Sequence, residues 1–533
     1  MNVLGDLISR AGVQFAERVA LVGERRTLRF SDVEAESNRL ATALARDFGL
    51  ARGARVAILL ANCPEFVITD FALIKAGLIR VPVNPRYTAY EVEFILHHSG
   101  AAALVTSAAF GDIVAHLRGR LSSPLRVIVV DDASQPAEAA PAAADAFGWR
   151  DVLARGTPDR FAVDVQEGDG YMIAYTSGTT GRPKGALTTV KARFANVMNV
   201  YANEMFVAPS DVMLHVASLA HGSGTKVFPF FIKGGVNVLL QRFSPAAFFE
   251  NVHKHGVTTS WMVPTMVAMI TDAPERAQAR CSSLRTIIYG GAPMPVPVMR
   301  RALAAFGPIF VQMYGLTEAP HPDFVLGKEE HVADGATAGP GSAGATGRAA
   351  IGVRIRLVDD TGRDVPVGEV GEILIAGEHV MTGYWNDPVA TAETLDDGWC
   401  RTGDLARMDK DGFYSIVDRK KEMIISGGYN VYPREVEDVL YRHPAIAECA
   451  VIGSPDEVWG ECVHALIVRK PGFEMTPEAL SAHCARELAG YKKPRRVTLL
   501  DALPRTANGK IDKKALRSQY SRGSDAPRAE SVT

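Results

Sequence analysis

The densest group of residues able to do chemistry lies at positions 175–185, where the chain reads YTSGTTGRPKG. Hydroxyl groups, glycines and one lysine in so short a segment supply O–H donors, backbone N–H groups and a positive charge, which together suit a polyphosphate. The spacing differs from the G-x-x-x-x-G-K-[ST] loop, because only two residues separate Gly178 from Gly181 and Lys184 follows later. We therefore predict a phosphate-binding loop of another kind. A flexible glycine loop without a ligand is the simpler alternative.

Two further segments place small or oxygen-bearing residues directly after predicted strands. The run GGAP at 290–293 follows a predicted strand at 286–289, and glycines at the end of a strand let a ligand approach the backbone closely. The run YGLTE at 314–318 continues from a predicted strand at 310–314. It offers a hydroxyl and a carboxylate, and hard oxygen ligands of this kind suit Mg²⁺.

Four later segments complete the pattern: WCRTGD at 399–404, DRKK at 418–421, SGGYN at 426–430 and PRTANGKI at 504–511. In this order, the six motifs and the glycine-rich loop resemble the adenylate-forming superfamily. That superfamily comprises acyl- and aryl-CoA synthetases, firefly luciferase and the adenylation domains of peptide synthetases. The resemblance covers nearly the whole chain, from about residue 27 to residue 514.

The resemblance implies a nucleotide site. The glycine-rich loop would wrap the β- and γ-phosphates of ATP, and GGAP would line the adenine and acyl pockets. Thr317 would touch the α-phosphate, Glu318 would help hold Mg²⁺, Asp404 would bind the ribose hydroxyls and Arg419 would reach phosphate. The implied ATP- and AMP-binding residues are Thr176, Ser177, Gly178, Thr179, Thr180, Lys184, Gly290, Gly291, Ala292, Pro293, Tyr314, Gly315, Thr317, Asp404 and Arg419.

The resemblance also implies a small domain that changes its orientation between two steps. Lys421 would be the hinge, and Gly427 and Gly428 would line the tunnel for the pantetheine arm of CoA. In the first step, Lys510 would be brought to the carboxylate and the α-phosphate. The implied catalytic residues are Lys510, Thr317, Glu318 and His221.

The predicted acyl pocket departs from the family pattern. The family usually has a proline ahead of an aromatic residue or histidine, which the segment SLAHGSG at 218–224 lacks. His221 is still expected to gate the passage between the ATP site and the acyl tunnel. After Glu318 the run APHPD at 319–323 is stiff and polar, so we expect a pocket with a polar or charged end. The predicted acyl-pocket residues are His221, Thr225, Lys226, Ala319 and His321.

The elements that must position these motifs alternate between helix and strand. The segment SDVE at 31–34 is typical of a capping box and opens a predicted helix that stops at Gly49, and RVAILL at 55–60 reads as a buried strand. A second predicted helix runs from an Asn62 cap to a stop at Gly77. After about Gly347, runs rich in β-forming residues and separated by turn signals favour antiparallel sheet or barrel.

With the resemblance, this rhythm predicts an α/β fold of two domains. Residues 1–420 would form a large N-terminal AMP-binding domain, with two αβ subdomains of mostly parallel sheet and a distorted β-barrel. Residues 421–520 would form a small, mobile α+β C-terminal domain. Residues 521–533 would be a disordered tail.

Composition excludes other classes of protein. The 533 residues include 58 Lys+Arg and 60 Asp+Glu, a net charge of −2, so nothing points to nucleic acid. We predict no membrane span, because no apolar run reaches the roughly 20 residues that a spanning helix needs. The six cysteines form no Cys-x-x-Cys pair, which indicates reduced thiols, a cytoplasmic protein and no zinc site.

The sequence thus predicts an AMP-forming carboxylate:CoA ligase that uses ATP, Mg²⁺, CoA and a small carboxylic acid. A free-standing adenylation enzyme that loads an aryl or amino acid onto a carrier protein is one alternative, and a non-catalytic relative is another. The sequence leaves the acid open among short or medium fatty acids, aryl acids and dicarboxylates. It also leaves the oligomeric state open, a homodimer included.

Overall fold

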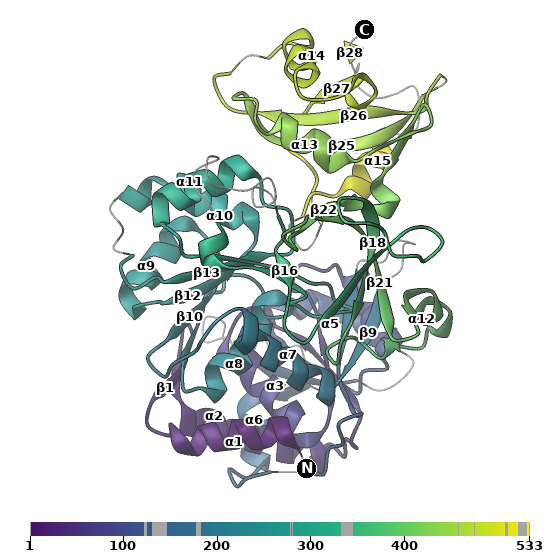
Figure 1. The fold of residues 1–533 in the computed structure, drawn as a ribbon. Helices are drawn as coiled ribbons and strands as arrows, with labels where there is room; N and C mark the ends of the chain where they lie inside the picture. Colours follow the sequence, from purple (N-terminus) through teal and green to yellow (C-terminus); the bar gives the residue numbers. More distant parts are fainter. Residues whose placement is uncertain are drawn as a thin grey trace.

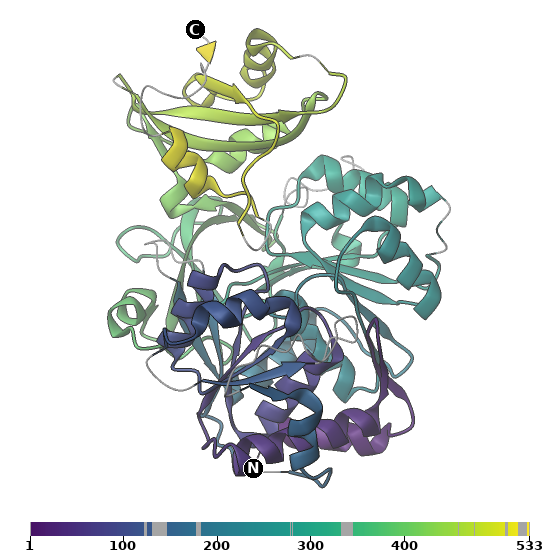
Figure 2. The same cartoon turned by 180° about the vertical axis from the view of Figure 1, so that it is seen from behind.

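Four β-sheets and the helices around them build the protein, as the computed structural model shows (Figure 1). The structure describes residues 2–121, 125–130, 146–161, 163–176, 183–277, 279, 281–331, 345–456, 458–473, 475–506, 510–520 and 530–531. The chain begins in the large domain, at the end farthest from the small domain, and the small domain sits at the opposite end (Figures 1 and 2). None of the described helices is both long enough and apolar enough to cross a membrane.

The first αβ subdomain is built on an eight-stranded sheet with the order β19-β9-β8-β4-β3-β5-β6-β7. Its strands from β8 to β7 are parallel, and β9 and β19 add antiparallel pairs at one edge. The strands are β3 (Arg55–Leu59), β4 (Ile79–Pro82), β5 (Ala103–Ser107), β6 (Arg126–Val130), β7 (Ala146–Gly148), β8 (Gly170–Thr176), β9 (Lys184–Thr189) and β19 (Gly383–Tyr384). Its helices are α4 (Ala89–Ser99), α5 (Gly111–Leu117) and α6 (Trp149–Arg155).

The second subdomain has a nine-stranded sheet with the order β16-β15-β14-β13-β12-β10-β11-β1-β2. The strands from β14 to β1 are parallel, and both edges are antiparallel. The strands are β1 (Val19–Val22), β2 (Thr27–Arg29), β10 (Val212–His215), β11 (Val236–Leu239), β12 (Thr259–Met262), β13 (Thr286–Gly290), β14 (Phe310–Tyr314), β15 (Phe324–Leu326) and β16 (Arg348–Ala349). The outer face carries α9 (Pro245–His255), α10 (Pro264–Asp272) and α11 (Val296–Phe306), as Figure 1 shows.

Apolar helices join the two subdomains. The rings of Phe30 and Phe71 lie 4.6 and 4.8 Å from that of Phe231, and all three belong to one buried cluster. Aromatic side chains contribute the largest buried apolar areas, so this cluster fixes the position of one subdomain on the other. The helices that meet here are α1 (Val3–Gln14), α2 (Phe30–Thr42), α3 (Pro64–Ala76), α7 (Val190–Asn203) and α8 (Val227–Ile232).

The third sheet is antiparallel, as predicted for the region after Gly347. Its order is β17-β18-β21-β20, with β22 paired to β21. The strands are β17 (Arg354–Val358), β18 (Val370–Ala376), β20 (Leu395–Asp396), β21 (Trp399–Met408) and β22 (Tyr414–Arg419), and α12 (Pro388–Thr394) precedes β20. The predicted combination of two αβ subdomains and a curled β-sheet is confirmed.

The small domain has its own sheet and its own core, an α+β arrangement as predicted. Its strands are β23 (Ile424–Ser426), β24 (Tyr429–Val431), β25 (Ile446–Asp456), β26 (Gly460–Arg469), β27 (Arg496–Leu499) and β28 (Glu530–Ser531). Its helices are α13 (Pro433–Leu440), α14 (Pro477–Ala485) and α15 (Lys513–Tyr520). Of the predicted tail, residues 530 and 531 pair with β27, and the rest of residues 521–533 lies outside the described residues.

The capping box predicted at 31–34 is wrong in its register. Helix α2 begins at Phe30, and the Asp32 carboxylate accepts from the Arg29 backbone N–H at 2.8 Å. The Ser31 hydroxyl instead donates to the carbonyl of Ala16 at 2.9 Å. The stop predicted for the next helix is confirmed, since α3 ends at Gly77 in the left-handed conformation.

Candidate active site

The predicted site residues converge where the large sheets, the antiparallel sheet and the small domain meet. Strands β13 and β14 end here, strands β21 and β22 of the third sheet lie between them and the small domain, and the small domain follows β22 (Figure 1). Ligands of α/β sheets bind outside the carboxyl ends of parallel strands, and this is such a place. Ser177, Gly178, Thr179 and Thr180 of the predicted phosphate loop lie outside the described residues.

Asp404 is held by two neighbours from different strands. The pairing of β21 with β22 places Asp404 opposite Arg419, and the Arg419 Nε lies 3.0 Å from Asp404 Oδ1. The Tyr314 hydroxyl, at the end of β14, donates to Asp404 Oδ2 at 2.6 Å. The Asp404 charge raises the pKa of Arg419, and burial followed by the same charge raises the pKa of Tyr314. The result is a carboxyl group held from two sides at the base of the site.

Glu318 lies in a second polar group, together with Tyr384 and Lys184. The Tyr384 hydroxyl donates to Glu318 Oε1 at 2.7 Å, and the Lys184 Nζ sits 5.2 Å from the centre of the Tyr384 ring, a cation–π geometry. The pairing of β19 with β9 places Tyr384 beside the strand that Lys184 begins. Tyr384 was not predicted, because an aromatic residue between a glycine and a tryptophan gives no chemical signal by itself.

Glu318 is a suitable ligand for a Mg²⁺ ion whose other ligands are mainly phosphate oxygens. Its hydrogen bond to Tyr384 engages one carboxylate oxygen, Oε1. Across the described ranges, no cluster of three or more His, Cys, Asp or Glu side chains could hold a metal ion by itself. One carboxylate with substrate phosphate oxygens and water is the usual ligand set of Mg²⁺ in nucleotide sites.

Two glycines in the motifs at the ends of β13 and β14 lie where any side chain would collide with the neighbouring backbone. A Cβ on Gly290 would lie 2.3 Å from the carbonyl oxygen of Met313 on the neighbouring strand, and one on Gly315 would lie 2.5 Å from backbone atoms of His321. Gly291, Ala292 and Pro293 directly follow β13, and Thr317 follows β14. Thr176 ends β8, where its hydroxyl is 3.5 Å from the carbonyl of Lys184.

Lys510 reaches this site from the small domain. The residue as a whole is exposed, but desolvation of its amino group lowers its pKa, the neighbouring Arg419 charge lowers it further, and the Asp404 charge opposes both. His221 responds to the same lysine: burial and then the Lys510 charge lower the pKa of His221 to about 4. His221 is therefore neutral at neutral pH, and its Nε2 is buried without a hydrogen-bond partner in the described structure. Four side chains from two domains therefore lie close together at this site: Lys510, His221, Arg419 and Asp404.

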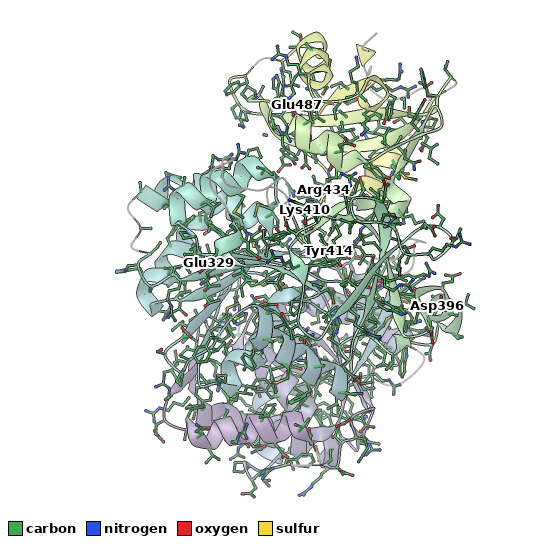
Figure 3. All side chains as sticks on the ribbon, viewed as in Figure 1. Glu329, Asp396, Lys410, Tyr414, Arg434 and Glu487 are labelled. Carbon is green, nitrogen blue, oxygen red and sulfur yellow. The ribbon has the colours of Figure 1, made fainter. Side chains whose placement is uncertain are left out.

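The small domain is docked through the segment after β22. Lys421 lies in the short 3₁₀ helix Lys420–Glu422, between the third sheet and β23. Arg434 spans the junction (Figure 3): its backbone N–H donates to Asp418 Oδ2 at 2.9 Å, and its Nη1 donates to the carbonyl of Ile416 at 2.8 Å. Burial raises the pKa of Asp418 to about 6. These contacts hold the orientation in which Lys510 faces the site.

The two glycines predicted to contact CoA lie in the turn between β23 and β24. Gly427 donates its N–H to the carbonyl of Trp459 at 2.9 Å, and a Cβ there would lie 2.4 Å from the Trp459 ring. Gly428 has φ +82° and open space around its Cα. The contacts of Gly427 are therefore made within the small domain.

The polar end predicted for the acyl pocket contains an ion pair. Lys226 Nζ lies 2.5 Å from Glu204 Oε2, and both side chains are 0% exposed. His321 Nδ1 is 3.4 Å from Lys226 Nζ, and its Nε2 is 3.4 Å from the Thr225 hydroxyl. Burial and the Lys226 charge lower the pKa of His321 to about 4, so the imidazole is neutral. Glu204 was missed, because an acidic residue at the end of a helix normally faces solvent.

Ala319 differs from the other predicted pocket residues. It is fully buried in the apolar cluster under the third sheet, together with Phe324 and Ile373. In this structure its side chain contributes to that core.

Comparison with known proteins agrees with this geometry. The chain matches the AMP-binding enzyme family over residues 8–385 and the AMP-binding enzyme C-terminal domain over residues 435–510. It is 40% identical to a feruloyl-CoA synthase of Amycolatopsis over 92% of this chain and 94% of the relative, and 34% identical to the medium/long-chain-fatty-acid–CoA ligase FadD8 of Mycobacterium tuberculosis over 89% and 83%. The solved structure of the amide bond synthetase McbA from Marinactinospora thermotolerans superimposes with a TM-score of 0.86 at 29% identity, covering 97% of this chain and all of the other.

The chain therefore belongs to the AMP-binding enzyme family, within the adenylate-forming superfamily that contains the acyl-CoA synthetases.

Proposed function

We propose that the protein is an ATP-dependent carboxylate–CoA ligase that forms an acyl-adenylate and then an acyl-CoA. The observation that carries this proposal is the position of Lys510, which the small domain presents to Asp404, Arg419 and His221 of the large domain. Two curated relatives named as CoA ligases or synthases support the choice of CoA as acceptor.

In the first step, a carboxylate oxygen of the acid attacks the α-phosphorus of ATP. The bond between the α-phosphorus and the bridging oxygen breaks, and pyrophosphate leaves with the electron pair. Asp404 is placed to accept hydrogen bonds from the ribose hydroxyls, and Lys510 is placed to offset the negative charge that develops around the α-phosphate. Mg²⁺, when held by Glu318 and phosphate oxygens, would supply further charge neutralisation.

In the second step, the sulfur of CoA attacks the carbonyl carbon of the mixed anhydride as a thiolate, its proton having passed to solvent. The bond from that carbon to the phosphate oxygen breaks, and AMP leaves with the electron pair. Lys510 is not needed near AMP in this step. A rotation of the small domain about Lys421 would remove it and bring Gly427 and Gly428 toward the site.

His221 suits the boundary between the two substrates because it is neutral. A second cation beside Lys510 would repel it, and the low pKa of His221 avoids that repulsion above about pH 5. A neutral ring can also pack against an apolar acyl group. We therefore assign His221 the role of the gate between nucleotide and acid.

The acid we favour is an aryl acid or another acid with a polar distal group. The Glu204–Lys226 pair, His321 and Thr225 support a polar end for the predicted pocket, where a polar distal group of the acid would find hydrogen-bond partners that an apolar chain end could not use. The feruloyl-CoA synthase relative acts, by its name, on an aryl acid of this kind.

The test of the proposed function follows pyrophosphate, AMP and thioester over a panel of carboxylic acids, with and without CoA. We expect pyrophosphate exchange for the preferred acid without CoA, and stoichiometric AMP and thioester only with CoA. If the acyl group is transferred to a carrier protein or to an amine and no thioester forms on CoA, the acceptor is that protein or amine and not CoA. No exchange with any acid would indicate a non-catalytic relative.

A further inference from the structure

A small cavity lies next to the predicted acyl pocket, on the far side of Thr225. It has a volume of about 30 Å³ and is bounded by strands β4, β8 and β9, helix α7 and the segment around Thr225. Since 10–15 Å³ suffices for one water molecule, the space holds about two waters or one compact group of that size. Its polar lining residues are Arg80, Tyr171, Thr188, Arg193, Asn196, Thr225 and His379, and no Asp or Glu occurs among the described lining residues.

Arg193 is the charge that this cavity leaves without a counterion. Its guanidinium donates from Nη1 to Asn196 Oδ1 at 2.7 Å and from Nη2 to the carbonyl of Thr225 at 3.1 Å. Both partners are neutral, and the side chain forms no ion pair with any carboxylate in the described ranges. The residue is only 7% exposed, and its Nε is buried without a partner. A buried cation without a counterion is strongly destabilising, so a chain that retains one is expected to bind an anion beside it.

The other charges around the cavity are balanced within the protein. Arg80 pairs with Asp70 at 2.5 Å, His379 with Asp323 at 2.6 Å, and Lys226 behind Thr225 with Glu204. Among the described residues that line the cavity, Arg193 is therefore the cation that has no carboxylate partner of its own. Arg80 Nε and His379 Nδ1 are also buried without partners. Three residues that line one small cavity thus each retain an unused ring or guanidinium nitrogen.

We propose that this cavity is an anion subsite that takes one compact monoanionic group, a carboxylate or a chloride-sized ion, with Arg193 as its cation. Two sources supply that chemistry. The group is either the distal carboxylate of the acid substrate, entering past Thr225, or a free ion that stabilises the fold. The first source rests on the proposed function, and the second does not.

The first arm of the test measures binding without catalysis. The unfolding temperature is recorded in gluconate buffer of constant ionic strength while chloride replaces gluconate. For the native protein we expect a saturable rise. Arg193→Met should unfold at a higher temperature than the native protein without chloride, because the uncompensated charge is gone, and should not respond to chloride. Arg193→Lys, which keeps the charge, should respond weakly.

Arg55→Met is the matched control. The Arg193 guanidinium donates to one backbone carbonyl and lies 5.6 Å from the centre of the Phe228 ring. Arg55 similarly donates to backbone carbonyls and lies 5.5 Å from the centre of the Trp385 ring, but it does not line the cavity. This variant should keep the native chloride response. A response that persists in Arg193→Met, or that disappears in Arg55→Met, would overturn the assignment to Arg193.

The second arm compares pyrophosphate exchange for acids of equal length that end in a methyl group or in a carboxylate. If the substrate supplies the anion, the native enzyme prefers the dicarboxylate, chloride competes with it, and Arg193→Met raises its KM about 10- to 100-fold, the scale of hydrogen bonds to a charged group. If a free ion fills the site, the chloride response appears without this preference. No chloride response and no preference would mean that water fills the cavity, and the proposal would be wrong. A chloride response without exchange for any acid would keep the anion subsite and reject the ligase.

Discussion

Asp404 illustrates how single residues make this site. Its two carboxylate oxygens are held by Arg419 from the paired strand and by Tyr314 from a different sheet, and the carboxyl group is only 5% exposed. A carboxylate fixed in this way is preorganised to accept hydrogen bonds from a nucleotide. The motif that contains Asp404 is visible in the sequence, but the two partners of Asp404 are 90 and 15 residues away from it.

The variant Asp404→Ala should bind ATP about 10- to 100-fold more weakly, because hydrogen bonds to a charged acceptor are worth roughly 1.5–3 kcal/mol. The KM for ATP in pyrophosphate exchange measures this change. Asp396→Ala is the control, since Asp396 is exposed and lies away from the junction (Figure 3). If the KM for ATP is unchanged in Asp404→Ala, Asp404 does not bind the ribose hydroxyls.

Lys510 should give adenylation an alkaline limit. Its pKa is lowered from the ordinary lysine value of 10.5 by desolvation of the amino group and by the charge of Arg419. Only the protonated form carries the charge that adenylation uses, so the rate should fall as pH rises through this lowered pKa. Lys510→Arg keeps its charge at every pH tested and should show no such fall, whatever its absolute rate. The rate of pyrophosphate exchange, measured from pH 7 to 10, distinguishes the native enzyme from Lys510→Arg. If both rates fall in the same way at alkaline pH, Lys510 is not the cause of the fall.

Among the helices and strands, the end of a helix could be predicted from the sequence, but the hydrogen bonds that cap the start of a helix could not. The stop of α3 at Gly77 follows from one left-handed residue, which glycine adopts readily. The cap of α2 was misassigned, because Ser31, Asp32 and Glu34 all offer acceptors near the same helix start. The choice among them depends on tertiary partners: Glu34 pairs with the buried Lys75, and Ser31 bonds to Ala16.

Gly428→Leu should impair the second half-reaction. Gly428 has φ +82°, which a leucine adopts only with strain, and the space beside it is open. We expect the variant to form acyl-adenylate at near-native rate while thioester formation from CoA drops at least tenfold. Glycine at 472, in a turn with φ +80° elsewhere in the small domain, gives the control Gly472→Leu. Equal losses in both half-reactions for Gly428→Leu would separate this glycine from the CoA step.

At the scale of the whole molecule, buried neutral histidines should make the protein sensitive to acid. Burial is the first cause that lowers the pKa values of His215, His321 and His464 to about 4, against 6.5 for an ordinary histidine. Between these values the unfolded chain binds protons that the native protein does not, so stability is complete above pH 6.5 and falls as the pH drops toward 4. Each histidine contributes at most about 3.5 kcal/mol, since one pKa unit is about 1.4 kcal/mol. The raised pKa of Asp418 offsets part of this loss.

The unfolding temperature measured from pH 8 to pH 5 tests that expectation. It should be nearly constant down to about pH 7 and then fall. His464→Asn removes one histidine that is enclosed by Ser454 and Thr498, and should make the fall less steep. A temperature that stays constant or rises between pH 7 and pH 5 would contradict the assignment.

The whole fold and most of the site motifs were predictable, because the motifs occur in order along nearly the full chain. Glu204, Tyr384 and the uncompensated charge of Arg193 were not. Glu204 and Tyr384 acquire their roles from partners that the fold brings from distant segments, Lys226 and Glu318. The role of Arg193 depends on which side chains the fold places beside it, and no carboxylate pairs with it in the part of the chain that the structure describes. A sequence shows which residues are charged, but not which charges are balanced.

In the proposed mechanism, the small domain presents Lys510 for adenylation and for that step alone. The most direct measurement compares the two half-reactions of Lys510→Ala. Pyrophosphate exchange should fall by about 10²–10³, the usual loss for one preorganised electrostatic group. The same variant, given pre-made acyl-adenylate and CoA, should form thioester at near-native rate. An equal loss in both half-reactions would instead indicate one fixed active site, and the hinge at Lys421 would be rejected with it.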